Sequence, residues 1–170
     1  GATLNNCVGN VAITVLQIAK DGDTMDVVPA IGGITGNAFY ATLTEGKVFT
    51  SIESCENKAN ILYKDNSCST EKWEVFPAVG GITGAVYHNT GIVKGTAITA
   101  VSIHNCINRG NITMQAVTGG QSQDTQGYPQ TQVGGVVGRG AYISLIGCKN
   151  YGTLKYDGTF AQLHTGGVAG

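Results

Sequence analysis

The chain has 170 residues, of which 42% are hydrophobic and 12% are charged, and its formal net charge is −1. The hydrophobic share excludes a disordered chain, and the near-zero charge excludes an electrostatic surface for nucleic acid. No apolar stretch approaches the roughly 20 residues that a membrane-spanning helix needs, so we expect no direct membrane insertion. The 26 glycines are about twice the average share, which indicates many turns.

Two short sequence boxes alternate four times along the chain. The cysteine box first reads Cys7-Val-Gly-Asn-Val-Ala-Ile13, and its cysteines are Cys7, Cys55, Cys106 and Cys148. The glycine box first reads Ile31-Gly-Gly-Ile-Thr-Gly36, and its first glycines are Gly32, Gly80, Gly134 and Gly166. Chance does not explain this alternation. We therefore expect residues 1–170 to be a single repeat domain of about three and a half units, taken from a longer array.

The spacing of the boxes predicts insertions at two places in the unit. The cysteines are 48, 51 and 42 residues apart, and the first glycines are 48, 54 and 32 residues apart. If 32 residues suffice for one period, the longer intervals contain insertions. They fall after the glycine box, at 37–54 and 85–105, and after the cysteine box, at 64–75 and 116–132. Insertions in repeat proteins commonly lie on one face, which is often the binding face.

Short β-strands are predicted in chain order at residues 11–18, 97–103 and 141–146, where apolar and polar residues alternate and β-branched residues are frequent. No stretch shows a helical period with caps. A period near 30 residues fits one coil of an all-β, parallel β-solenoid (β-helix) with loop or hairpin insertions, and a right-handed coil is the default for parallel crossovers. Two coils per 48-residue period is an open alternative, and a β-sandwich is the main alternative that is not a solenoid.

Equivalent positions of stacked coils form ladders along the axis. The residue that closes the cysteine box would form an internal apolar ladder of Ile13, Ile61, Ile112 and Leu154. The cysteines of such a ladder have parallel Cα–Cβ bonds, which is poor geometry for a disulfide. We therefore expect Cys7, Cys55, Cys106 and Cys148 to form a ladder of buried thiols. Cys68 lies in an insertion, either as a free thiol or as the partner of one displaced ladder cysteine.

The glycines and asparagines of the boxes suit turns. The glycine box fits a tight corner, because glycine tolerates positive φ and a close approach of backbone. The asparagine two residues after each later cysteine fits a left-handed turn with stacked side-chain amides. These asparagines are Asn57, Asn108 and Asn150. Gly9 occupies the same position in the first unit, in keeping with a left-handed turn.

Together the boxes resemble the GLUG-motif repeats of bacterial surface and secreted proteins. The best matches are Cys-Ile-Asn-Arg-Gly-Asn-Ile at 106–112 and Val-Gly-Gly-Val-Val-Gly at 133–138. The resemblance spans essentially the whole chain apart from the insertions, and it departs at Gly9, which replaces asparagine, and at Ala59, which replaces glycine. It implies an exported bacterial protein, extracellular or at the cell surface, of an adhesin-like or peptidase-associated architecture.

Groups for catalysis or metal binding are not clustered in the sequence. Neither Gly-x-Ser-x-Gly nor His-Glu-x-x-His is present, and Cys-x-x-Cys is absent. The three histidines are scattered, at His88, His104 and His164. The densest group of acids, Asp21, Asp23 and Asp26, is expected to be a solvated loop, with weak Ca²⁺ binding as the alternative. We therefore expect no catalytic residues, no bound metal and no cofactor, so the chain is not predicted to be an enzyme.

Aromatic side chains in and beside the insertions are the best candidates for a binding surface, since Tyr and Trp are favoured at interfaces. The predicted partner or glycan surface consists of Tyr40, Trp73, Tyr87, His88 and Tyr128. The alternative is that these side chains pack on the flank of the solenoid.

Three functions fit these observations. The first is a non-catalytic structural or adhesive module, whose partners are neighbouring repeats of the same or parent chain and a host or bacterial surface glycan or protein. The second is a carbohydrate-binding or carbohydrate-active β-helix domain. The third is a filament subunit that assembles by head-to-tail stacking. Ice binding is disfavoured, because the row begun by Thr35 and Thr83 continues as Val137 and Ala169.

Overall fold

The computed structural model describes residues 2–17, 29–40, 50–65, 77–88, 101–116, 131–158 and 163–170. These ranges contain β-strands and no helix, and therefore no helix that could cross a membrane. The strands are β1 (Ala2–Asn5), β2 (Val8–Gly9), β3 (Ile13–Gln17), β4 (Ala30–Gly32), β5 (Thr35–Tyr40), β6 (Thr50–Glu53), β7 (Glu56–Asn57), β8 (Ile61–Asp65), β9 (Ala78–Gly80), β10 (Thr83–His88), β11 (Val101–His104), β12 (Ile107–Asn108), β13 (Ile112–Ala116), β14 (Thr131–Gly134), β15 (Val137–Gly140), β16 (Ile143–Ile146), β17 (Lys149–Asn150), β18 (Leu154–Asp157) and β19 (Leu163–Gly166).

The strands stack into five parallel sheets, one for each strand position in the unit. Their orders are β1-β6-β11-β16, β2-β7-β12-β17, β3-β8-β13-β18, β4-β9-β14-β19 and β5-β10-β15. Equivalent strands of successive units are hydrogen-bonded neighbours, so each unit forms a single coil. The predicted all-β parallel solenoid is confirmed, and neither the two-coil period nor the β-sandwich fits this topology.

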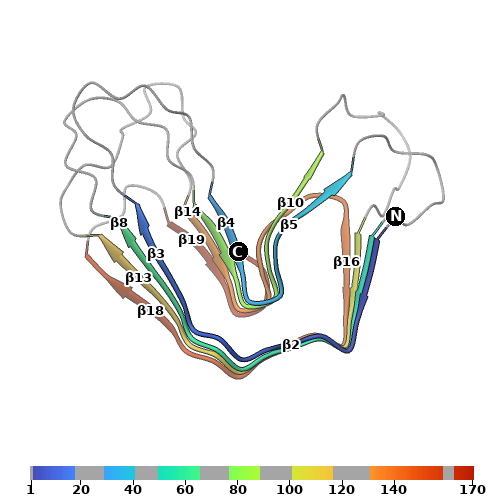
Figure 1. Cartoon of the computed structure of the whole chain (residues 1–170). Coiled ribbons are helices and arrows are strands. Elements are labelled where there is room, and N and C mark those ends of the chain that lie inside the picture. The colour runs from blue at the N-terminus through green and yellow to red at the C-terminus, as the bar shows by residue number, and fades with distance from the viewer. Residues whose placement is uncertain are drawn as a thin grey trace.

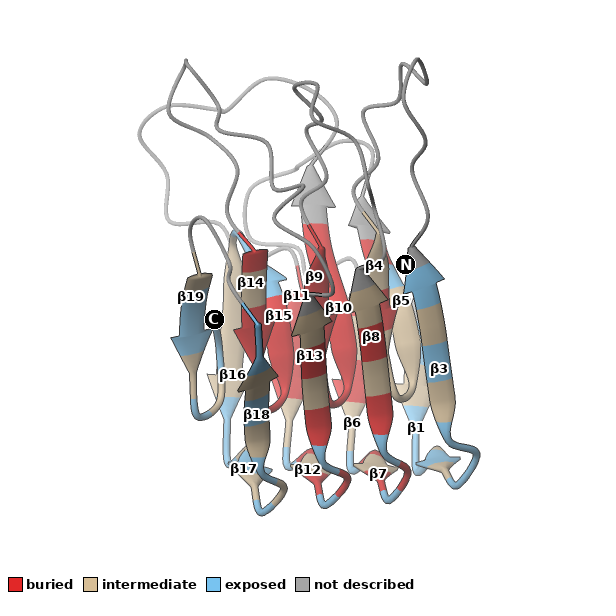
Figure 2. Cartoon of the chain, turned by 90° about the vertical axis from the view of Figure 1, so that its left-hand side faces the viewer, coloured by how far each residue is buried: buried red, intermediate tan, exposed pale blue. Residues whose placement is uncertain are grey.

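Each coil folds back on itself. Three outer strands form a trough, which consists of the cysteine-side wall (β1, β6, β11, β16), the floor (β2, β7, β12, β17) and the isoleucine-side wall (β3, β8, β13, β18). The fourth and fifth strands form two inner walls that meet at the glycine box just above the floor (Figure 1). In Figure 1 the chain runs clockwise from β1 through β2 to β3. Figure 2 places later coils farther from the viewer of Figure 1, so the solenoid is right-handed.

Two apolar cores fill the space between the outer and inner walls. One lies behind the cysteine-side wall and includes Ile52, Ile82, Val86, Val101 and Ile103. The other lies behind the isoleucine-side wall and includes Ile61, Tyr63, Val79, Ile112, Met114 and Val133. The glycine box separates them, because the residue before its two glycines enters the second core and the residue after them enters the first, as Val79 and Ile82 do. Burial is greatest in the two middle coils (Figure 2).

The predicted apolar ladder is confirmed by the strand register. Ile61 is paired with Ile13 on one side and with Ile112 on the other, and Ile112 is paired with Leu154. Ile61 and Ile112 are almost completely buried. This ladder holds the isoleucine-side wall against the inner wall.

The predicted insertions are partly wrong, because much of 37–54 and 85–105 belongs to the coil. β5 pairs with β10, and β6 pairs with β11, so these ranges contribute ladder strands on both sides of a connection. The strand ends that flank residues 18–28, 41–49, 66–76, 89–100 and 117–130 all lie on the side of the molecule opposite the floor (Figures 1 and 2). The strand ends that these ranges join therefore lie on one face of the solenoid.

The left-handed residue lies before the cysteine and not at the asparagine. Asn6, Ser54, Asn105 and Gly147 have φ between 52° and 65°. They form the corner between the cysteine-side wall and the floor. The expectation of left-handed turns at Asn57, Asn108 and Asn150 is wrong, because these residues belong to the floor strands β7, β12 and β17.

The glycine box requires glycine because other parts of the chain lie very close to its backbone. Positive φ is not the reason, since the described glycines of the box are not among the residues with positive φ. A β-carbon added to Gly33 would collide with the side chain of Asn57, and one added to Gly81 would collide with that of Asn108. Gly9 has the same explanation, because a β-carbon there would lie 2.5 Å from the carbonyl oxygen of Gly33. The inner walls can come this close to the floor because the glycines of the glycine box have no side chain there.

Candidate functional site

Part of the predicted aromatic surface comes together at the end of one inner wall. β5 and β10 are paired so that Phe39 lies beside Tyr87 and Tyr40 beside His88. The register thus brings the backbones of three predicted residues, Tyr40, Tyr87 and His88, to adjacent positions at the ends of β5 and β10. Trp73 and Tyr128 lie outside the described residues, as do Cys68 and the acids Asp21, Asp23 and Asp26.

The four repeated cysteines lie one above another at the corner between the cysteine-side wall and the floor. The backbone N–H after each later cysteine donates to the carbonyl of the cysteine below it, from Glu56 to Cys7, from Ile107 to Cys55 and from Lys149 to Cys106, each at 2.9 Å. All four are free thiols. Cys55 and Cys106 are fully buried, whereas Cys7 and Cys148 in the outer coils are half-buried.

Each later thiol also lies against the backbone of the preceding coil. Cys106 Sγ is 3.5 Å from the carbonyl oxygen of Ile52, and Cys148 Sγ is 3.2 Å from that of Ile103. The neighbouring thiol of Cys106 lowers the pKa of Cys148 to about 6, and the pKa of Cys106 is raised in turn. Burial raises the pKa of Cys55. The ladder therefore places one acidic, half-buried thiol beside a buried thiol that resists ionisation.

The asparagines form a second ladder beneath the glycine box. Asn57 Nδ2 donates to Asn108 Oδ1, and Asn108 Nδ2 donates to Asn150 Oδ1, both at 2.8 Å. Each Nδ2 also donates to the backbone carbonyl two residues on, at Ala59, Gly110 and Gly152. Asn57 and Asn108 are fully buried, so these amides satisfy polar groups of the floor that water does not reach.

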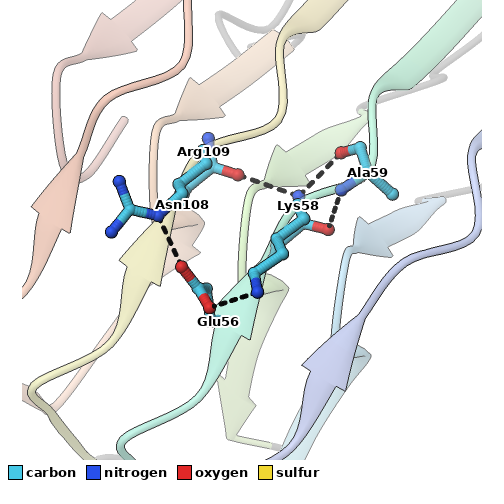
Figure 3. Close-up of polar contacts among 6 residues, drawn as sticks. Glu56, Lys58, Ala59, Asn108 and Arg109 are labelled. Carbon is cyan, nitrogen blue, oxygen red and sulfur yellow. Dashed lines mark hydrogen bonds and ion pairs between the residues drawn. The ribbon is translucent and has the colours of Figure 1, made fainter.

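The outer face of the floor carries a charged cluster (Figure 3). Glu56 lies between Lys58, at 3.1 Å, and Arg109 of the next coil, at 2.5 Å. Hydrogen bonds from Arg109 and Lys58 lower the pKa of Glu56. The guanidinium carbon of Arg109 lies 5.1 Å from the ring centre of Tyr151 in the last coil, within the range of a cation–π contact. The cluster links three coils on the solvent side.

A serine, a histidine and a glutamate come together on the outer face of the cysteine-side wall. Ser102 Oγ lies 2.7 Å from His104 Nε2. Glu53 is in register with His104 on the neighbouring coil, and among the described residues its carboxylate accepts a hydrogen bond from Ser51, at 2.6 Å, and not from the imidazole. The arrangement therefore contains a Ser–His pair without the carboxylate–histidine bond that orients the base of a catalytic triad.

Both clusters were missed by the sequence reasoning, although a signal was present. Glu53 and His104 each lie two residues before a cysteine, and Arg109 and Tyr151 each lie three residues after one. Residues with the same offset from the cysteine are neighbours on adjacent coils. Reading the outward-facing positions in this way would have identified the pairs.

Among the described residues, no group of three or more His, Cys, Asp or Glu side chains is arranged to hold a metal ion. Comparison of the chain with protein-family models, with curated proteins and with solved structures finds no match.

Proposed function

We propose that this chain is a non-catalytic structural module of an exported bacterial surface protein. The observation that carries the proposal is that the repeated residues make contacts within the stack of coils. The four repeated cysteines, the asparagines of the last three units and the glycines of the middle units face neighbouring coils or the inner walls. A motif maintained for stacking supports a role as a scaffold, and so does the resemblance of the boxes to GLUG-motif repeats.

The outward-facing positions differ from unit to unit, as expected if the scaffold displays different side chains on its surface. The outward-facing floor residue after each cysteine is Val8, Glu56, Ile107 or Lys149, with no shared chemistry. Adhesion to a host or bacterial surface glycan or protein would rest on such positions and on the edge that carries the connections. The partners along the axis would be neighbouring repeats of the same or parent chain.

Protease shaving of intact cells of the encoding bacterium tests the location, with an antibody raised against the 170-residue chain. The proposal expects the epitope to be lost from intact cells, while a cytoplasmic marker is retained. An epitope that is degraded only after lysis would refute surface display.

Hydrolysis of activated ester and glycoside substrates tests the non-catalytic part. We expect no turnover above that of a Ser102→Ala control. Turnover that is lost in Ser102→Ala would make the Ser102–His104 pair catalytic and overturn this part of the proposal.

Carbohydrate binding is the second candidate, and the register of β5 and β10 favours it because Tyr40 lies beside His88 and Phe39 beside Tyr87. A glycan array of the purified chain tests it, with Tyr40→Ala, Tyr87→Ala and Trp73→Ala as variants. A sugar-binding role predicts a hit that Tyr87→Ala weakens by more than about 1 kcal/mol. An array without hits would remove this candidate.

A filament role is tested by light scattering over a range of protein concentrations. Growth of the particle mass with concentration would indicate end-to-end stacking of coils. A constant monomer mass would exclude self-assembly of this chain.

A further inference from the structure

We propose that the thiol ladder binds a soft d¹⁰ cation such as Cu(I) in linear, two-coordinate geometry, between the sulfur atoms of Cys106 and Cys148. Such a site goes beyond the proposed scaffold function, which requires the thiols only to pack. The register of the cysteines, their spacing and their unequal accessibility support such a site.

The register aligns the two thiols along the solenoid axis. The hydrogen bond from Lys149 N to Cys106 O, at 2.9 Å, places Cys148 directly over Cys106. Strands in a sheet lie about 4.8 Å apart, so equivalent atoms of the two residues are separated by about that distance. Side chains aligned in parallel are unsuited to a disulfide, which needs the two Cβ atoms turned toward each other.

The same spacing suits a cation between the sulfurs. Metal–thiolate bonds are about 2.3 Å long, so two bonds in line span about 4.6 Å. This nearly equals the step between coils, and it requires little movement of the backbone. Thiolates are soft ligands that select Cu(I). A tetrahedral zinc site is not available at the ladder, since the described residues hold no group of three or more suitable ligands.

Accessibility favours this end of the ladder over its middle. Cys148 is half-buried, which gives an ion access, whereas Cys55 and Cys106 are fully buried. Binding forms two Cu–S bonds and releases the thiol protons of Cys106 and Cys148 to water. Cys106 then gives up its hydrogen bond to the carbonyl of His104, at 3.3 Å, and Cys148 gives up its hydrogen bond to the carbonyl of Ile103, at 3.2 Å. The oxidation state of the metal does not change.

Binding of Cu(I) under anaerobic conditions tests the proposal, in competition with a chromophoric Cu(I) chelator. A Cys68→Ser background removes the one cysteine outside the ladder. We expect Cys148→Ser and Cys106→Ser to weaken Cu(I) binding by more than about 100-fold, above the loss typical of an outer-shell partner. Cys7→Ser is the matched control from the far end of the ladder, and it should change the affinity for the first ion less than twofold.

X-ray absorption of the one-equivalent complex provides a readout that does not depend on folding of the variants. Two sulfur ligands and no other close ligand are expected. Three or more ligands, or Cu(I) held equally well by Cys148→Ser, would overturn the proposal, and so would failure of the parent chain to retain Cu(I) against the chelator. Circular dichroism checks that each variant is folded. If Cys106→Ser does not fold, Cys148→Ser and the absorption spectrum decide the question.

Discussion

The side-chain amide of Asn57 donates a hydrogen bond of 2.8 Å to the side-chain oxygen of Asn108, although 51 residues separate the two in the chain. Asn108 in turn donates to Asn150 at the same distance. The middle asparagine thus acts as acceptor and donor in a row that crosses three coils. Its removal should affect both neighbours.

We predict that Asn108→Ala lowers the free energy of unfolding by about 2 to 3 kcal/mol, because it leaves buried polar groups of Asn57, Asn150 and Gly110 without their partner. Urea denaturation measures the change. The exposed Asn10 is the matched control, and Asn10→Ala should stay within about 0.5 kcal/mol. Equal effects of the two substitutions would show that the row contributes nothing to stability.

Gly81 and Gly167 occupy the same position of the glycine box, but a methyl group should destabilise the fold at only one of them. At Gly81 a β-carbon would collide with the backbone of Gly135 and with the side chain of Asn108, whereas at Gly167 nothing lies within 4 Å. We predict that Gly81→Ala costs about 3 kcal/mol or prevents folding, and that Gly167→Ala is nearly neutral. Thermal unfolding of both variants checks this. A neutral Gly81→Ala would mean that the inner walls do not rest on the floor.

The stability contributed by Glu56 should be lost in acid. Its pKa lies below the ordinary value of 4.5 in the folded chain, through its hydrogen bonds with Arg109 and Lys58. A depressed pKa adds stability above the unfolded pKa, and that stability disappears as the pH falls through the folded pKa. The difference in melting temperature between the parent chain and Glu56→Gln should therefore shrink below about pH 4.5. A difference that is independent of pH would contradict the ion-pair assignment.

Alkylation should distinguish the cysteines of the ladder. The thiolate is the reactive form, and the pKa of Cys148 is about 6. We predict that iodoacetamide labels Cys148 of the folded chain at a rate that rises with a midpoint near pH 6, while Cys55 and Cys106 react only after unfolding. Peptide mass spectrometry at several pH values measures the rates. Preferential labelling of Cys106 would show that the acidic thiol is the other member of the pair.

The coil and its internal ladders could be predicted from the sequence because the boxes repeat. Ile61 and Ile112 share an offset from the cysteine, and shared offset means shared position in a parallel stack. The same logic places the four cysteines in one corner. The offset from the cysteine therefore predicts the position of a residue in the stack, whatever the length of the connections between the boxes.

The path of the coil between the boxes could not be predicted in the same way. Gly33 and Gly81 indicate that something lies close to them, but a missing side chain does not say what that is. The position of the left-handed residue was also hidden, because the four residues before the cysteines are Asn6, Ser54, Asn105 and Gly147, which share no obvious type. The predicted aromatic surface depends on residues in the connections, where no repeat constrains the reading.

The connection between the fifth strand of one coil and the first strand of the next has nine residues at 41–49, twelve at 89–100 and two at 141–142. The strands that follow all pair in one continuous register, as Leu4, Ile52, Ile103 and Leu145 do. Lengthening a connection adds a closure entropy that grows only logarithmically. Evolution can therefore lengthen, shorten or exchange these segments while the framework stays constant, and foreign peptides grafted there should be presented by a scaffold whose folding they do not disturb.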